Sequence, residues 1–166
     1  MKIVSLLNKT SWDRIMTTEQ EKRLAKLGEY YGPWLEGDDL KQAALMRIAK
    51  AGHAEILLGC WGTPALDADI VRACKGLKLY AYGAGSIKST INKELIEQGV
   101  RATTAAPAIG IGVAEFAVTQ IYAFAKKMFY YRARSHADFR NDLAATSGQK
   151  VFEIYRHAIG LVGMGF

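Results

Sequence analysis

The chain has 166 residues, of which 50% are hydrophobic and 23% charged, a composition typical of a soluble globular protein of one domain or slightly more. Its formal net charge is +6, but residues 1–106 carry 15 basic and 12 acidic side chains, and residues 107–166 carry 7 and 4. Because both signs are mixed along the chain, the composition argues against the clustered Lys and Arg of a nucleic-acid-binding protein, and we expect no nucleic-acid partner.

The cysteines and the most apolar segments indicate a cytoplasmic protein. Cys60 and Cys74 stand in no metal-ligand pattern, so we expect reduced thiols and no metal site. The apolar run at the amino terminus is too short for a signal peptide. Residues 105–125 are the most apolar stretch, but they contain Pro107 and Glu115 and make a poor membrane span.

The first half of the chain alternates between strand and helix patterns. Residues 2–7 predict a buried strand, and residues 17–30 predict a charged helix. Asp38-Asp39 offers an N-cap for a second helix, which Gly52 ends. The continuous apolar run over residues 54–60 is typical of a strand that is covered on both faces.

The same alternation continues to residue 104. A short helix is predicted over residues 63–74, a strand over 77–82, a helix over 92–98 and a strand over 100–104. Strands and helices that alternate with short connections predict an α/β fold, in which a parallel sheet has helices on both faces. Ligands of such sheets bind at the carboxyl ends of the strands, where the loop Gly83-Ala84-Gly85 is expected.

A different pattern starts at Val113. Apolar residues at helical spacing predict one long helix over residues 113–131, with an apolar surface broad enough to be buried on more than one side. Residues 132–156 read as a polar connection, and residues 159–162 as a short apolar strand. After this strand, the terminal Gly163-Met164-Gly165-Phe166 matches the first four positions of the G-x-G-x-x-G dinucleotide fingerprint.

These motifs together resemble the D-isomer-specific 2-hydroxyacid dehydrogenases, and most closely their phosphoglycerate-dehydrogenase-like branch. The resemblance rests on the ordered set: the Gly83-Ala84-Gly85 loop, Gly99-Val100, Val113-Ala114-Glu115 at the start of a long helix, and the terminal glycine motif. It covers nearly the whole chain. It implies the N-terminal part of a longer enzyme, truncated within the fingerprint.

The resemblance implies two domains. Residues 1–106 would be a flavodoxin-like substrate (catalytic) domain that lacks its C-terminal closing helix, and residues 107–166 would begin a Rossmann-type NAD(P)-binding domain. The helix over residues 113–131 would form the interface of a homodimer. Because much apolar surface would be exposed in this chain alone, we expect oligomers or poor solubility.

The resemblance also implies the site residues. Gly83, Ala84 and Gly85 would offer backbone N–H groups to the carboxylate of a small 2-hydroxy or 2-oxo acid. Gly163 and Gly165 would lie against the pyrophosphate of NAD or NADP. The arginine, glutamate and histidine that catalyse the reaction in this family lie after the fingerprint, so no catalytic residue is assigned here.

Two functions therefore remain open. The first is the N-terminal part of an NAD(P)-dependent oxidoreductase acting on the CH–OH group of a 2-hydroxy acid, with this chain inactive on its own. The second is a non-catalytic module that dimerises or senses a dinucleotide. A receiver domain is disfavoured, because the predicted strands do not end in clustered acidic residues.

Overall fold

The computed structural model describes residues 1–134 and 151–163. The chain divides into two compact units, Met1–Pro107 and Ala108–Phe166.

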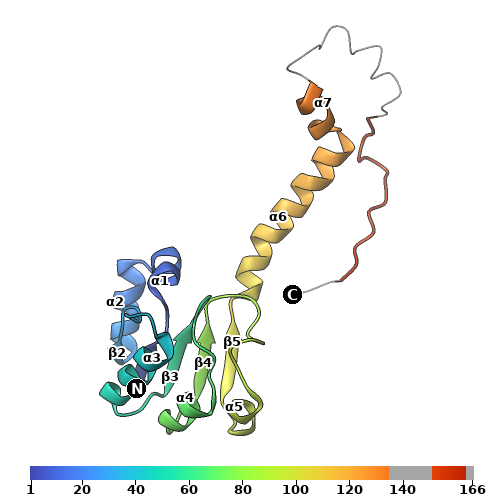
Figure 1. The fold of residues 1–166 in the computed structure, drawn as a ribbon. Helices are drawn as coiled ribbons and strands as arrows, with labels where there is room; N and C mark the ends of the chain where they lie inside the picture. Colours follow the sequence, from blue (N-terminus) through green and yellow to red (C-terminus); the bar gives the residue numbers. More distant parts are fainter. Residues whose placement is uncertain (135–150, 164–166) are drawn as a thin grey trace. The chain divides into compact units, whose positions relative to one another are not determined.

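A five-stranded parallel sheet forms the centre of the first unit (Figure 1). Its strands lie in the order β2-β1-β3-β4-β5, which is the flavodoxin-like order of a doubly wound sheet. The predicted α/β fold is therefore confirmed. The strands are β1 (Lys2–Ser5), β2 (Glu29–Tyr31), β3 (Ile56–Gly59), β4 (Leu79–Tyr82) and β5 (Arg101–Thr104).

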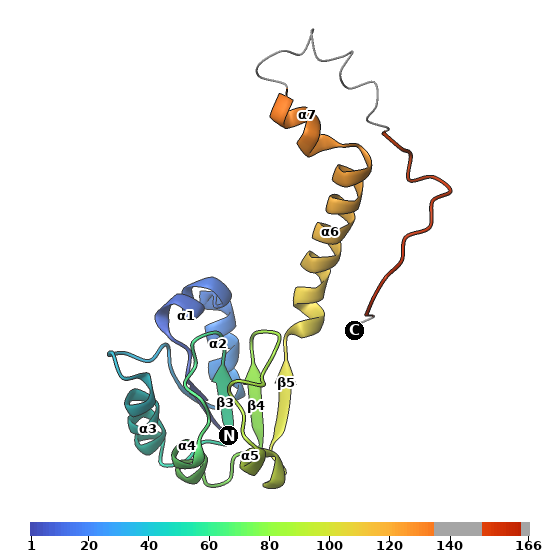
Figure 2. The same cartoon turned by 45° about the vertical axis from the view of Figure 1, so that its right-hand side comes forward.

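Helices lie on both faces of this sheet. Figure 2 shows α3, α4 and α5 in front of the strands and α2 behind them. The helices of the unit are α1 (Lys9–Ile15), α2 (Thr18–Leu27), α3 (Leu40–Ala51), α4 (Ala68–Ala73) and α5 (Lys93–Glu97).

Side-chain caps fix where these helices begin. The Asp39 carboxylate accepts a hydrogen bond from the N–H of Gln42 at 3.0 Å, and Gly52 ends the same helix with a φ of 78°, as predicted. Thr17 and Gln20 form a reciprocal capping box at the start of α2. The helix predicted over residues 63–74 begins only at Ala68, because Asp67 is its N-cap.

Two elements at the amino-terminal end differ from the prediction. Asn8 caps a helix, α1, that the sequence pattern did not indicate. The helix predicted over residues 17–30 ends at Leu27, and Glu29–Tyr31 pair in parallel with β1 as β2. Pairing with a neighbouring strand therefore outweighs the helical pattern at Tyr30.

The core of the first unit lies between the sheet and its helices. Val4, Leu57 and Tyr80 are 0% exposed and stand in register on three neighbouring strands. Ile48 of α3 and Ile70 of α4 belong to the same buried cluster. The three central strand positions of this face are therefore fully covered.

The last two helices of the described residues are α6 (Ala106–Ala125), which begins at the end of the first unit and continues into the second, and α7 (Met128–Arg134) in the second unit. The single helix predicted over residues 113–131 was wrong at both ends. The helix begins seven residues earlier, at Ala106, and it includes Gly110 and Gly112. It is interrupted before α7, where Lys127 adopts a left-handed φ of 54°.

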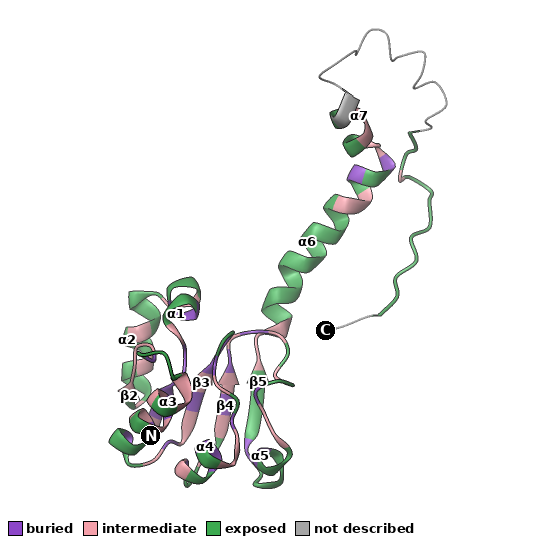
Figure 3. Cartoon of the chain, viewed as in Figure 1, coloured by how far each residue is buried: buried purple, intermediate pink, exposed green. Residues whose placement is uncertain are grey.

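Most of α6 is exposed, as the green ribbon in Figure 3 shows. Phe116 and Phe124 are 65% and 68% exposed. By length and composition this helix is apolar enough to cross a membrane, but one such helix is weak evidence for a membrane protein.

The strand predicted over residues 159–162 is not present in the structure. These residues adopt no regular structure, and Leu161 is 76% exposed. A strand is stabilised by hydrogen bonds to a neighbouring strand, and within the described ranges no residue pairs with this segment. Most of the predicted polar connection, residues 135–150, lies outside the described residues.

Candidate functional site

The candidate site lies where β1, β3 and β4 end on the same edge of the sheet. The strands continue their ladder past their last residues: the N–H of Leu6 donates to the carbonyl of Leu58 and the N–H of Gly83 to the carbonyl of Gly59, both at 2.8 Å. The loops that follow these strands therefore start from fixed positions. Parallel sheets usually bind their ligands at this edge.

Polar side chains tie the first two loops together. The Nδ2 of Asn8 and the Oγ of Ser11 both donate to the carbonyl of Trp61, at 3.2 and 2.6 Å. The hydroxyl of Thr63 accepts from the N–H of Cys60 at 2.8 Å and donates to the carbonyl of Leu6 at 3.3 Å. These four bonds hold the turn around the exposed Trp61 against the end of β1.

The third loop, Gly83 to Gly85, contains backbone donors without acceptors. Of the three predicted residues, Gly83 has its N–H bonded to the carbonyl of Gly59. Within residues 1–134 and 151–163, no acceptor receives the N–H of Ala84 or Gly85. Ala84 is 0% exposed, and a buried N–H group without a partner in the protein is rare. Because Ala84 is covered, the loop as it stands can offer an anion one accessible N–H group, that of the partly exposed Gly85.

The surroundings of the two loop glycines differ. A Cβ on Gly83 would lie 3.0 Å from the Cδ1 of Ile15, whereas a Cβ on Gly85 would meet no atom within 4 Å. Gly83 therefore packs directly against α1, and Gly85 faces open space from which a ligand could approach.

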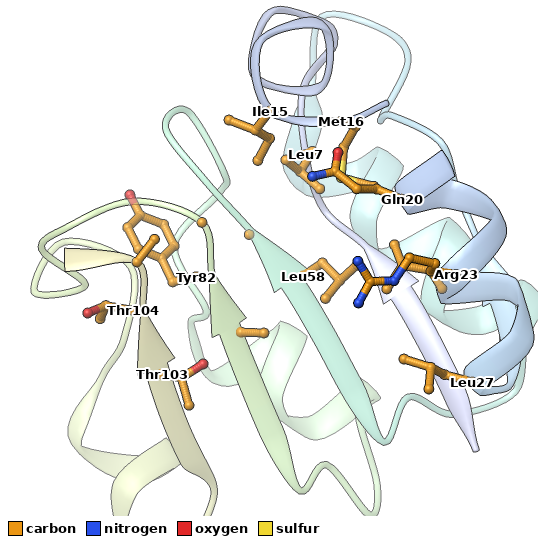
Figure 4. Close-up of a pocket in the computed structure, with 15 residues that line it drawn as sticks. Leu7, Ile15, Met16, Gln20, Arg23, Leu27, Leu58, Tyr82, Thr103 and Thr104 are labelled. Carbon is orange, nitrogen blue, oxygen red and sulfur yellow. The ribbon is translucent and has the colours of Figure 1, made fainter. Parts of the chain in front are cut away.

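A pocket of about 460 Å³ begins at this loop and runs between α2 and the sheet (Figure 4). Its floor contains Leu58 and Ala81, and Arg23 is the single charged residue that lines it. Figure 4 shows the Arg23 guanidinium extending from α2 toward Leu58. The remaining lining residues come from the same helices and strand ends: Leu7, Ile15, Met16, Gln20, Leu24, Leu27, Gly59, Tyr82, Gly83, Thr103, Thr104 and Ala105.

The ionisable groups near the site do not suggest acid–base chemistry. Tyr82 lines the pocket, and burial raises the pKa of its hydroxyl. This hydroxyl therefore stays protonated at neutral pH. The described residues contain no cluster of His, Cys, Asp or Glu that could hold a metal ion.

The predicted cofactor glycines belong to the second unit. Gly163 is exposed, its φ is 84°, and a Cβ there would meet no atom within 4 Å. This backbone is open to the close approach of a phosphate. Gly165 lies outside the described residues. Gly163 is therefore the one of the two predicted glycines that belongs to the described residues.

Sequence reasoning missed the polar residues that shape the site. Asn8 and Thr63 lie in the loops that follow β1 and β3, and Ser11 lies in the first turn of α1. Asn8 is a strong N-cap type, which was the available signal. No sequence pattern indicated that Arg23 lines the pocket, because its position over the sheet depends on how α2 packs.

Comparison with known proteins gave matches among solved structures. No family model matches the chain, and no curated protein matches it. The PH0520 protein from Pyrococcus horikoshii OT3 is 18% identical with a TM-score of 0.64, over 92% of this chain and 42% of that chain.

Two further structures are enzymes. D-mandelate dehydrogenase from Rhodotorula graminis is 15% identical with a TM-score of 0.59, over 87% of this chain and 42% of that chain. The acyclic imino acid reductase Bsp5, in complex with NADPH and D-Arg, is 12% identical with a TM-score of 0.57, over 84% and 43%.

The chain spans about two fifths of the length of these structures. Identities this low establish the fold and not the reaction. At the level of the fold, the predicted resemblance is confirmed: this chain has the α/β fold of D-2-hydroxyacid dehydrogenase domains.

Proposed function

We propose that this chain is the N-terminal part of an NAD(P)-dependent oxidoreductase that acts on the CH–OH group of a 2-hydroxy acid. The observation that carries the proposal is the unbonded N–H group of Gly85, which faces open space on the ligand-binding edge of a dehydrogenase-type fold. Such a donor suits the carboxylate of a small 2-hydroxy or 2-oxo acid.

The two units would have different roles. Residues 1–106 would be the substrate domain without its closing helix, and residues 107–166 would begin the NAD(P)-binding domain, where Gly163 and Gly165 would face the pyrophosphate. The nicotinamide would supply or accept the hydride. This chain would bind and orient the substrate carboxylate, in the cytoplasm, as part of a homodimer joined through residues 113–131.

Residues 1–166 alone would be inactive in this proposal. The described part of the site offers backbone donors and an apolar pocket, but no group poised to transfer a proton. We expect no oxidation of NADH or NADPH when the purified chain is mixed with pyruvate. Turnover above the rate without protein would contradict this expectation.

The carboxylate role can be tested by NMR without any turnover. The chain, labelled with ¹⁵N, is titrated with pyruvate, and with acetone as a control that lacks the carboxylate. We expect pyruvate, and not acetone, to shift the amide signals of Ala84 and Gly85 more than that of Gly83, whose N–H is already bonded. Equal shifts with acetone, or no shift in this loop, would refute the proposed substrate site.

A non-catalytic dimerising module is the second candidate function. The exposed apolar side chains of α6 favour it, because they provide a surface for a partner and need no chemistry. The NMR titration separates the two candidates, since a pure dimerisation module has no reason to bind pyruvate at residues 83–85.

A further inference from the structure

The loop after β4 is fixed at two points, and the second of them lies next to the unbonded N–H of Gly85. The first point is the N–H of Gly83, which donates to the carbonyl of Gly59. The second is the carbonyl of Ala84, which accepts a hydrogen bond from the N–H of Ala105 at 3.0 Å. Among the residues that the structure describes, no other hydrogen bond involves the backbone of Ala84 or Gly85. The peptide group between these two residues is therefore anchored by Ala105 alone.

The position of Ala105 is set by the end of the edge strand β5. Its N–H also donates to the carbonyl of Tyr82 at 3.1 Å, so the ladder between β4 and β5 continues past Thr104, the last residue of β5. One N–H that is shared between two carbonyl groups forms a three-centre hydrogen bond. The side chain of Ala84 is 0% exposed and belongs to the core. Ala84 is therefore held by its side chain and by its carbonyl group.

This anchor decides the direction of the Gly85 N–H, because the carbonyl of Ala84 and the N–H of Gly85 belong to one peptide group. A trans peptide is planar, and its C=O and N–H bonds point in opposite directions. When Ala105 holds the carbonyl toward β5, the N–H of Gly85 must point away from β5. The surroundings of Gly85 are open, since a Cβ there would meet no atom within 4 Å.

The same hydrogen bond makes this N–H a stronger donor. Hydrogen bonds that are linked in a chain polarise one another, so a bond to the carbonyl of a peptide group strengthens a bond from its N–H. A carboxylate at Gly85 would complete such a chain, which runs through the peptide group to the N–H of Ala105. Each of the two hydrogen bonds would then strengthen the other.

We propose that Ala105 is a positioning residue of the anion site, and that its backbone N–H orients and polarises the N–H of Gly85 that receives the substrate carboxylate. The inference rests on the proposed function of this loop and adds the residue that controls its donor. Ala105 immediately precedes Ala106, where α6 begins. Binding of a carboxylate at Gly85 therefore changes a hydrogen bond at the residue that leads into this helix.

The test removes one N–H group and keeps every side chain. L-lactic acid in place of Ala105 turns the preceding peptide into an ester, which lacks this donor. The matched control is the same replacement at Ala102 of β5. Because the N–H groups of Arg101 and Ala105 donate to β4, the alternation along the strand turns the N–H of Ala102 toward the free edge of the sheet. Ala105→Gly changes the side chain, keeps the N–H and is the second control.

Two NMR measurements on ¹⁵N-labelled chains follow the effect at Gly85. Without ligand, the ester at residue 105 should move the amide signal of Gly85, and the ester at residue 102 should leave it in place. In a pyruvate titration, the ester at residue 105 should weaken binding about 2- to 10-fold, the range expected for one lost hydrogen bond. The ester at residue 102 and Ala105→Gly should bind pyruvate as the original chain does.

A third measurement needs no variant and therefore does not depend on how well the esters fold. The scalar coupling across the hydrogen bond, between the ¹⁵N of Ala105 and the carbonyl ¹³C of Ala84, should increase in magnitude when pyruvate is added. Acetone, which lacks the carboxylate, should leave this coupling unchanged. A coupling that stays constant at saturating pyruvate would overturn the proposal.

Equal pyruvate affinities of the two ester variants would also overturn it, as would an unmoved Gly85 signal in the ester at residue 105. These results leave the proposed function standing, because the original chain still binds pyruvate at Gly85. If pyruvate shifts no signal of this loop in the original chain, the proposed function fails and the role of Ala105 fails with it.

Discussion

Replacing Gly59 with alanine should destabilise the first unit strongly. A Cβ at this position would overlap the Tyr80 hydroxyl and lie 2.7 and 2.9 Å from the Cε2 and Cζ atoms of its ring. Tyr80 is 0% exposed and packed beneath the site, so it cannot swing into solvent. Forcing extra volume into a packed core costs about 1–3 kcal/mol. With a urea m-value of about 1–3 kcal/mol/M, the unfolding midpoint should fall by about 1 M.

The chain offers a matched control and a convenient signal. Gly85→Ala also adds one methyl group to the same edge of the sheet, but its Cβ would meet nothing within 4 Å, so its midpoint should not move. Trp12, Trp34 and Trp61 all lie in the first unit, and their fluorescence therefore reports its unfolding.

A double mutant tests the physical cause. Tyr80→Phe removes the hydroxyl that a Cβ at residue 59 would overlap, so the pair Gly59→Ala and Tyr80→Phe should lose at least about 0.5 kcal/mol less than the sum of the two single changes. Equal midpoints for Gly59→Ala and Gly85→Ala, or strictly additive effects in the double mutant, would refute the steric reasoning.

Three further predictions concern other parts of the chain. Hydrogen bonds from the Lys78 ammonium and the Lys2 N–H lower the pKa of Glu55 from 4.5 to about 2. The stability that Glu55 contributes is therefore present above pH 4.5 and is lost as the pH falls toward 2. Glu55→Gln should make the urea midpoint less dependent on pH in this window, whereas Glu19→Gln should leave that dependence unchanged. Asn8→Ala removes both an N-cap and the hydrogen bond to the carbonyl of Trp61, whereas Asn92→Ala removes an N-cap alone, which costs about 1 kcal/mol. Asn8→Ala should therefore lower the free energy of unfolding more than Asn92→Ala does. Equal losses in urea unfolding would disprove the role of the Trp61 bond. Replacing Phe116 and Phe124 of α6 with Glu should reduce the mass of the particle measured by light scattering, and an unchanged mass would contradict an interface there.

Local signals predicted the fold where one side chain decides the backbone. Asp39 and Gly52 marked both ends of α3, and the apolar runs marked β1, β3 and β4. The prediction failed where distant contacts decide. Tyr30 joins a strand because β1 lies beside it, and residues 159–162 form no strand because no described neighbour pairs with them. The place of the loop Gly83-Ala84-Gly85 after β4 could be predicted from the sequence, but the bond that occupies the N–H of Gly83 required the register of β3 and β4.

The strand order has a consequence for how the chain can fold during synthesis. β1 is made first and lies inside the sheet, with β2 on one side and β3 on the other. Each later strand pairs with one that already exists, β4 with β3 and β5 with β4. The sheet can therefore grow strand by strand as the polypeptide leaves the ribosome, and no strand has to wait for a partner that has not yet been translated.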